Sequence, residues 1–211
     1  MTKKQAAPTA PAGLDTATVV RAALDLLDDK GAGAVSVRGV AERLGVRMNT
    51  VLWHAKTKGR LLELMADEIV AGARLDALPG PWRERVEELA HRYRRALLAR
   101  RDGALIVAGT YAAEPATLHY ADTVLAALLE GGLDERRAAW TFWSIQYLAL
   151  GLTQEQQALA AQDGEHSLAG ALADGTYPAL ARAVRHMEGE DFDGRFAFAL
   201  DRLLEQPSQE G

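Results

Sequence analysis

The chain has 211 residues, of which 48% are hydrophobic and 25% charged, values typical of a globular protein with a substantial core. It contains no cysteine, which excludes disulfide bonds, a thiolate nucleophile and zinc–thiolate sites. The net charge of −5 is unevenly spread: residues 1–60 carry ten Lys and Arg against five Asp and Glu, and residues 61–211 carry fourteen against twenty-four. A basic first quarter (+5) on an acidic remainder (−10) predicts a polyanionic partner at one end, with chance clustering as the alternative.

Residues 1–13 contain two lysines and two prolines but no apolar run, so they predict a flexible arm rather than a signal peptide. No apolar stretch reaches the length of about 18 residues that suggests a membrane span. We therefore expect a cytoplasmic protein.

Capping residues predict where the helices begin and end in the segment after the arm. Asp15 is a suitable N-cap for a first helix, which Gly31 ends. Ser36 is a suitable N-cap for a short second helix, with Gly45 directly after it. A third helical segment, 49–54, follows after only three more residues.

The helices at 37–44 and 49–54 are too short to bury their apolar faces alone. With the tight, glycine-containing turn between them they are typical of a helix-turn-helix, packed on the first helix and on a fourth helix that Thr57 caps. A helix in the DNA major groove needs such a packed back and a front of hydrogen-bond donors. Asn49 can pair with adenine and the arginines with guanine, while Trp53, His54 and the lysines can reach phosphates. The candidate DNA contacts are Arg38, Arg47, Met48, Asn49, Thr50, Trp53, His54, Lys56 and Lys58, of which Met48 could instead belong to the core.

The sequence Leu-Pro-Gly-Pro at 78–81 stops the fourth helix and marks a second region. The rest of the chain has helical periodicity, without a convincing strand pattern or an internal repeat. The segments predicted there are helices at 82–100, 115–130, 134–157, 178–186 and 191–205, a short apolar segment at 104–109 and loosely structured residues at 160–177. The sequence thus predicts an all-α protein with a flexible arm (1–13), a three-helix helix-turn-helix domain (14–56), a connecting helix (57–78) and a C-terminal domain (79–211).

Residues 14–70 resemble the N-terminal domain of the TetR (tetracycline repressor) family. The resemblance rests on the short helix after Ser36, on Leu44-Gly45-Val46, on Thr50 to His54 and on Lys56-Thr57-Lys58. It implies that the recognition helix follows Gly45 and that Lys58 touches backbone phosphate. It also implies a dimeric DNA-binding regulator of a palindromic operator, a repressor or, alternatively, an activator. Two positions depart from the family pattern: Leu52 replaces a tyrosine that contacts phosphate, and Ala55 replaces a phenylalanine.

The C-terminal domain resembles the tetracycline repressor class over residues 96–110 and 150–155. This resemblance implies an effector pocket, and homodimer contacts on the helices at 134–157 and 191–205. In the last helix Leu200 and Leu203 belong to an apolar stripe without obvious cover. The candidate pocket residues are Leu89, Tyr93, Val107, Thr110, Trp140, Trp143, Tyr147 and Glu155. For the aromatic residues of helix 134–157, a place in the core is an equally good interpretation.

In the tetracycline repressor class a histidine anchors the magnesium–drug complex, and an asparagine faces the drug. The resemblance places these two positions at Val107 and near Leu89, which are apolar. We therefore expect a flat, hydrophobic or aromatic effector bound without a metal or cofactor, and not magnesium–tetracycline. The alternative is a pocket filled by its own side chains, and hence no effector.

The sequence offers little for an enzyme. Its five histidines show no metal-ligand spacing, and no G-x-S-x-G, Walker or G-x-G-x-x-G motif occurs. We expect no catalytic residues. The alternative from another class is an all-helical ligand-binding or adaptor protein without specific DNA binding.

Overall fold

The computed structural model describes residues 14–111, 113–160, 170, 172, 176–187 and 191–205. Within these ranges the chain forms ten α-helices, one short 3-10 helix and no strand, which confirms the predicted all-α class. The predicted arm at 1–13 and most of the predicted loose segment at 160–177 lie outside the described residues. None of the helices described is long and apolar enough to cross a membrane.

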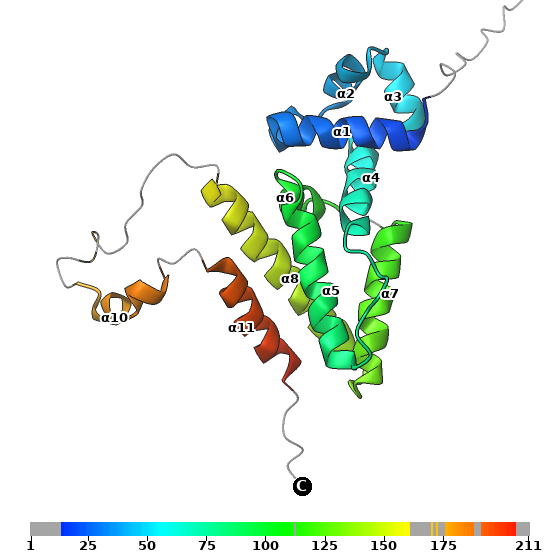
Figure 1. The fold of residues 1–211 in the computed structure, drawn as a ribbon. Helices are drawn as coiled ribbons and strands as arrows, with labels where there is room; N and C mark the ends of the chain where they lie inside the picture. The colour runs from blue at the N-terminus through cyan, green and yellow to red at the C-terminus, as the bar shows by residue number, and fades with distance from the viewer. Residues whose placement is uncertain are drawn as a thin grey trace, which may run out of the picture.

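A small head of three helices is joined to a larger helical body by α4 (Figure 1). The head consists of α1 (Thr16–Lys30), α2 (Val37–Leu44) and α3 (Met48–Ala55). One continuous apolar core runs from the head through α4 into the body. The position of the head therefore depends on how α4 is held.

The helices α1 and α2 begin and end at the capping residues that the sequence predicted, whereas α3 begins at Met48 without a side-chain cap. The Asp15 carboxylate accepts a hydrogen bond from the Thr18 amide at 2.7 Å, and Ser36 Oγ accepts one from the Gly39 amide at 3.0 Å. Gly45 ends α2 with a φ of 65°, a left-handed conformation that costs glycine little. The tight turn between α2 and α3 follows from this conformation.

The connecting helix α4 (Lys58–Ala71) is shorter than predicted. Its start is the predicted one, with Thr57 Oγ1 accepting a hydrogen bond from the Arg60 amide at 3.0 Å. The backbone turns at residues 72–77, where Arg92 of the next helix donates to three carbonyl groups at 2.6 to 3.3 Å. Because these carbonyls are bound by a side chain, the segment need not continue the helix to residue 78.

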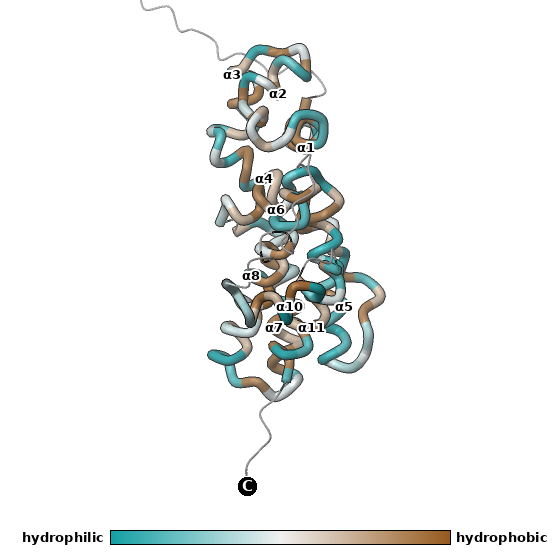
Figure 2. The backbone as a smooth tube through the Cα atoms, turned by 90° about the vertical axis from the view of Figure 1, so that its left-hand side faces the viewer, coloured by the Kyte–Doolittle hydropathy of each residue, from teal (hydrophilic) through white to brown (hydrophobic). Residues whose placement is uncertain are grey.

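The body is a bundle of amphipathic helices. They are α5 (Trp82–Leu98), α6 (Gly103–Ala108), α7 (Pro115–Glu130), α8 (Glu135–Ala160), α10 (Pro178–Met187) and α11 (Phe192–Leu204). α5 contacts α6, α7 and α8, and α11 packs along α8 (Figure 1). Figure 2 shows hydrophobic and hydrophilic residues mixed along these helices, as amphipathic packing requires.

The apolar stripe of α11 is covered by its own chain, contrary to the prediction. Leu200 is only 2% exposed and belongs to the core together with Phe196, while Leu203 is partly buried against that core. The cover is supplied by the packing of α11 along α8. On another side of α11, Phe198 is 70% exposed. Leu200 and Leu203 therefore stabilise the single chain, and Phe198 is the large apolar side chain of α11 that remains outside.

Candidate nucleic-acid interface and ligand pocket

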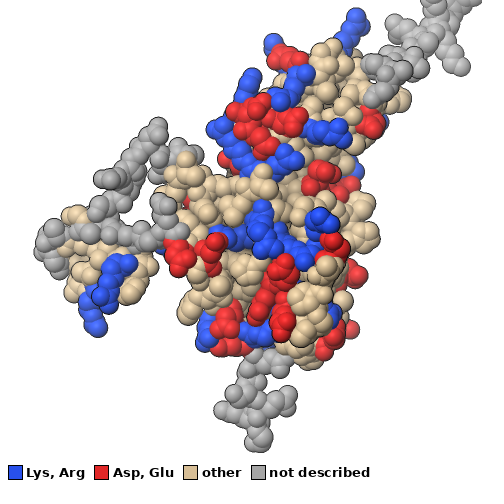
Figure 3. All heavy atoms as spheres, viewed as in Figure 1, with Lys and Arg blue, Asp and Glu red and all other residues tan. Residues whose placement is uncertain are grey.

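The helix α3 separates a packed side from an exposed side. Val51 and Ala55 are fully buried in the head, whereas Asn49 and Trp53 are exposed. Figure 3 shows Lys and Arg side chains projecting from the head, where they are interspersed with Asp and Glu as they are on the body. The segment from Arg47 to Lys58, which contains α3, carries basic residues and no acidic one. α3 thus presents a polar, basic side on a short, packed helix, which is the geometry that a major groove accepts.

Most of the predicted DNA contacts are on this outer surface. Met48 is 47% exposed, and its side chain is therefore not a core residue. The Arg38 guanidinium forms an exposed ion pair with Glu42 at 2.8 Å, and pairs of this kind are weak enough to be exchanged for a phosphate or a base. The exposed residues of the predicted set are Arg38, Arg47, Met48, Asn49, Trp53, Lys56 and Lys58, and Thr50 is partly buried.

His54 does not fit the role that the sequence suggested. Its Nδ1 lies 3.4 Å from Thr16 Oγ1, and its Nε2 is buried without a hydrogen-bond partner among the described residues. The imidazole thus faces α1 instead of the outer surface, because His54 lies next to the buried side of α3. His54 is therefore turned away from the surface on which the other predicted DNA contacts lie.

A cavity of about 290 Å³ lies in the body next to α4. Its walls are mainly aromatic and aliphatic side chains from α5, α6, α7 and α8, and α4 contributes Ala66 and Val70. Pockets that hold small organic ligands have volumes of about 300–1,000 Å³ and mainly apolar walls. The cavity is therefore suited to a small, largely apolar molecule.

The cavity contains half of the predicted pocket residues. Tyr93, Val107, Thr110 and Trp143 line it. Leu89 does not, because it is fully buried in the packing of α5 against the core.

The three predicted pocket residues that remain are on α8, and they lie outside the cavity because another face of this helix is turned toward it. Phe142 and Gln146, four residues apart, point one face of α8 into the cavity. Trp140 and Tyr147 are on another face and are 60% and 67% exposed. Glu155 is also exposed, and its carboxylate lies 3.6 Å from Arg195 of α11. These three predicted residues therefore lie outside the cavity in the described chain.

Gln146 was missed by the sequence reasoning. Its side chain is 6% exposed, and Nε2 has no hydrogen-bond partner among the described residues. The signal that could have found it is the spacing of Phe142, Gln146 and Leu150, which repeats every four residues and places one polar side chain on an apolar stripe.

Two stacked tyrosines form part of the cavity wall. The rings of Tyr93 and Tyr120 have centroids 5.0 Å apart and are inclined by 21°. Burial raises the pKa of both phenols, so both remain neutral at physiological pH. The Tyr120 hydroxyl donates to the Leu89 carbonyl at 3.4 Å.

Polar contacts tie α4 to the start of α7, beside the cavity. The Asp67 carboxylate of α4 accepts hydrogen bonds from the Thr117 amide at 2.7 Å and the Thr117 hydroxyl at 2.8 Å. Near the start of α4, Arg60 binds the Glu114 carboxylate through two nitrogens, one of them at 2.9 Å. These hydrogen bonds with Arg60 lower the pKa of Glu114, which therefore stays charged at neutral pH. Thr117 also lines the cavity, so one residue both forms part of the cavity wall and is hydrogen-bonded to α4.

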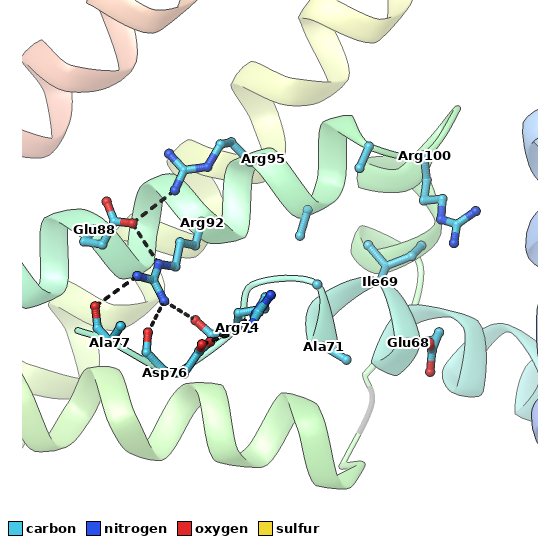
Figure 4. Close-up of a pocket in the computed structure, with 13 residues that line it drawn as sticks. Glu68, Ile69, Ala71, Arg74, Asp76, Ala77, Glu88, Arg92, Arg95 and Arg100 are labelled. Carbon is cyan, nitrogen blue, oxygen red and sulfur yellow. Dashed lines mark hydrogen bonds and ion pairs between the residues drawn. The ribbon is translucent and has the colours of Figure 1, made fainter.

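A second hollow, a groove of about 880 Å³ between α4 and α5, is rich in arginine (Figure 4). Its guanidinium groups are already paired. Arg92 and Arg95 bind Glu88 at 2.7 and 3.2 Å, and Arg74 binds Asp76 at 2.9 Å. The groove is open, and its four arginines face three acidic side chains, so the less open and mainly apolar cavity is the better candidate for a ligand site.

Comparison with protein families gives two matches along the chain. The family described as bacterial regulatory proteins, tetR family, matches residues 19–65. The family described as the tetracyclin repressor-like C-terminal domain matches residues 77–205. The first match contains α2 and α3, and the second contains the helices of the body.

Curated proteins and solved structures agree with these matches. The tetracycline repressor protein class A from transposon 1721 of Escherichia coli is 38% identical over 151 residues, 70% of this chain and 69% of the relative. The class G repressor of Vibrio anguillarum is 31% identical over 194 residues, 90% of this chain and 92% of the relative.

Three crystal structures are similar over most of the chain. A possible TetR family transcriptional regulator from Streptomyces coelicolor A3(2) has 36% identity and a TM-score of 0.77, with 90% of this chain and 96% of that chain covered. ActR from Streptomyces coelicolor in complex with actinorhodin has 25% identity and a TM-score of 0.78, covering 92% and 94%. BioQ with its natural double-stranded DNA operator has 27% identity and a TM-score of 0.63, covering 80% and 99%.

Proposed function

Because the chain belongs to the tetR family of bacterial regulatory proteins and is a DNA-binding transcriptional regulator, we propose that it is a repressor released from its operator by a small aromatic effector. The observation that carries this proposal is the shared helix α4, which bears the head at one end and forms a wall of the body cavity. A ligand in the cavity and DNA bound at the head would therefore both act on α4.

The operator is a palindromic duplex bound by two copies of the chain. Asn49 and Thr50, with Arg38 and Arg47, read base edges, while Trp53, Lys56 and Lys58 contact phosphates. The exposure of these side chains, apart from the partly buried Thr50, supports the assignment. BioQ, solved with its DNA operator, supports DNA binding by this fold.

The effector is a flat, mostly apolar molecule that needs no metal. The aromatic lining of the cavity supports this class, and ActR, solved with actinorhodin, supports ligand binding in a similar body. Tetracycline repressors are relatives, but the position that the resemblance assigns to the metal-anchoring histidine is Val107. The protein acts in the cytoplasm, where its operator lies, and performs no catalysis.

Release of DNA requires that the ligand favours one position of α4. The contacts of Asp67 with Thr117, and of Arg60 with Glu114, join α4 to the helix start beside the cavity. The head has a second attachment at the turn after α5, where Arg100 binds Asp28 of α1 at 2.6 Å. A ligand that displaces the start of α7 therefore shifts α4 against this attachment, which changes the separation of two heads in a dimer.

A gel-shift experiment with the DNA upstream of the gene tests this proposal. We expect a discrete complex at nanomolar protein that a planar aromatic ligand dissociates. Failure to prefer this DNA over unrelated duplex would instead favour a helical ligand-binding or adaptor protein. Activation of the adjacent promoter in a reporter assay would identify an activator.

A further inference from the structure

We propose that the effector carries a carbonyl-type oxygen on its aromatic frame, and that Gln146 Nε2 donates a hydrogen bond to this oxygen. The inference deepens the proposed function and rests on it, because it concerns the same cavity. It names a specificity-determining residue and the functional group that this residue recognises.

The primary observation is a buried donor without an acceptor. Gln146 is 6% exposed and lines the cavity, and its Nε2 has no hydrogen-bond partner among the described residues. Buried donors are satisfied in the large majority of cases, since an unpaired one loses its hydrogen bonds to water without replacement. An acceptor inside the cavity supplies the missing partner.

The neighbours of Gln146 do not supply it. On α8, Phe142 and Leu150 flank Gln146 one turn before and one turn after, and both are apolar. Burial raises the pKa of the Tyr120 phenol, and the neighbouring amide of Gln146 acts in the opposite direction. That hydroxyl, however, donates to the Leu89 carbonyl and forms no hydrogen bond of standard geometry with Nε2. The donor therefore remains available to a ligand.

The remaining lining determines the rest of the ligand. Tyr93 stacks on Tyr120, and Tyr111 stacks on Trp143 at 6.4 Å with an inclination of 20°. Flat aromatic walls favour a planar ring system. The described lining contains no charged side chain, so the occupant is neutral. A neutral planar molecule with an acceptor oxygen is an aromatic ketone, a quinone or a related carbonyl compound.

Fluorenone and fluorene test the inference, because the two planar molecules differ in a carbonyl oxygen. We expect calorimetric titration of the unmodified protein, without DNA, to show about tenfold tighter binding of fluorenone, the effect of one buried hydrogen bond. In Gln146→Met, which keeps an unbranched side chain of similar length, this preference should vanish. Gln154→Met, on the same helix but outside the cavity, is the matched control and should keep it.

Equal affinity of the unmodified protein for both molecules would overturn the inference, and so would a preference that survives in Gln146→Met. Binding of neither molecule would also overturn it, because the planar frame is part of the claim. A thermal melt adds a second readout: Gln146→Met should be at least as stable as the unmodified protein, since it removes an unpaired donor, whereas marked destabilisation would mean that the protein itself satisfies Gln146. These measurements do not involve DNA, so they test the inference about Gln146 alone. The gel shift tests the proposed function separately, because it shows whether the protein binds an operator.

Discussion

Asn49 stands on the exposed side of α3, one turn from side chains that are completely buried. Val51 and Ala55 fix the helix to the head, so the direction of Asn49 is set by packing that DNA does not disturb. Lys58, at the start of α4, is exposed as well but lies beyond the recognition helix. Substitutions at these two residues therefore allow base reading and phosphate binding, as proposed, to be tested separately.

We predict that Asn49→Ala costs about 1–3 kcal/mol of binding free energy at one base position and relaxes the preference there. Lys58→Ala is the matched comparison: it should weaken binding to all sequences alike and reduce the slope of log affinity against log salt by about one. Fluorescence anisotropy with operator variants over a range of salt concentrations measures both. If Asn49→Ala kept the site preference and the affinity, α3 would not be the recognition helix in the way proposed.

Val107, in the wall of the cavity, bears on the metal requirement of the effector. An apolar side chain offers magnesium no ligand, and Mg²⁺ needs an oxygen-rich octahedral shell. We predict that tetracycline does not release the operator in a magnesium-dependent way. Titration of tetracycline with and without magnesium, followed by tryptophan fluorescence and anisotropy of labelled operator, checks this. Tight release that requires magnesium would refute it.

Single residues differ in how far the sequence determines them. Asp15, Ser36 and Thr57 were predictable as caps because a cap depends on a hydrogen bond to a residue three positions away. The place of His54 was not predictable, and for Gln146 the sequence carried only its position on an apolar stripe, because the direction of each side chain depends on how its helix is rotated against other helices. Local hydrogen bonding determines the capping residues, whereas tertiary packing determines the direction of His54 and Gln146.

At the scale of the helix, α4 joins the head to the body through polar contacts as well as through apolar packing. Its side chains Ala66 and Val70 face the cavity, and Asp67 caps the backbone amides at the start of α7. Such a cap from another helix satisfies amides that a helix start leaves unpaired. The start of α7 therefore depends on α4 for its cap, in addition to the apolar contact between the two helices.

We predict that Glu114→Gln weakens the communication between effector and operator. The substitution removes the charge that Arg60 binds with two nitrogens but keeps the shape of the side chain. Effector affinity in the absence of DNA should change little, while the factor by which effector lowers operator affinity should fall about fivefold or more, the scale of allosteric coupling energies.

Anisotropy of labelled operator, with and without saturating effector, measures that factor. The control is Glu130→Gln at the other end of α7, which removes an ion pair with Arg85 at 2.7 Å and should leave the factor unchanged. An equal loss in both variants would show that the charge on α7, not the link to α4, matters.

Helix limits were predictable along most of the chain, whereas helix faces were not. The predicted helix 115–130 agrees with α7, because Pro115 suits a first turn and glycines follow Glu130. On α11 the apolar stripe was recognised but assigned to a partner subunit, although α8 of the same chain covers Leu200. Periodicity identifies an apolar face, but it carries no information about which helix will cover it.

The whole molecule still exposes large apolar side chains after the single chain has folded. Trp140 and Tyr147 of α8 and Phe198 of α11 are each at least 60% exposed, on two helices that lie side by side (Figure 1). We expect the interface of the dimer at these two helices, because large apolar side chains that meet in one exposed patch are typical of an interaction site. Two copies joined through α8 and α11 would form a four-helix bundle and present two heads to a palindrome.

We predict that Phe198→Glu yields a folded monomer. The side chain is 70% exposed, so the charge disturbs an interface and not the core, unlike a substitution of the buried Leu200. Light scattering should change from dimer to monomer at micromolar concentration, with little loss of melting temperature. Operator affinity should fall by several orders of magnitude, because a monomer reaches one half-site and about half of the phosphates. Leu129→Glu, an exposed apolar position on α7, carries the same charge change and should remain a dimer. A monomeric unmodified protein would refute the dimer. A Phe198→Glu variant that stays dimeric would place the interface elsewhere.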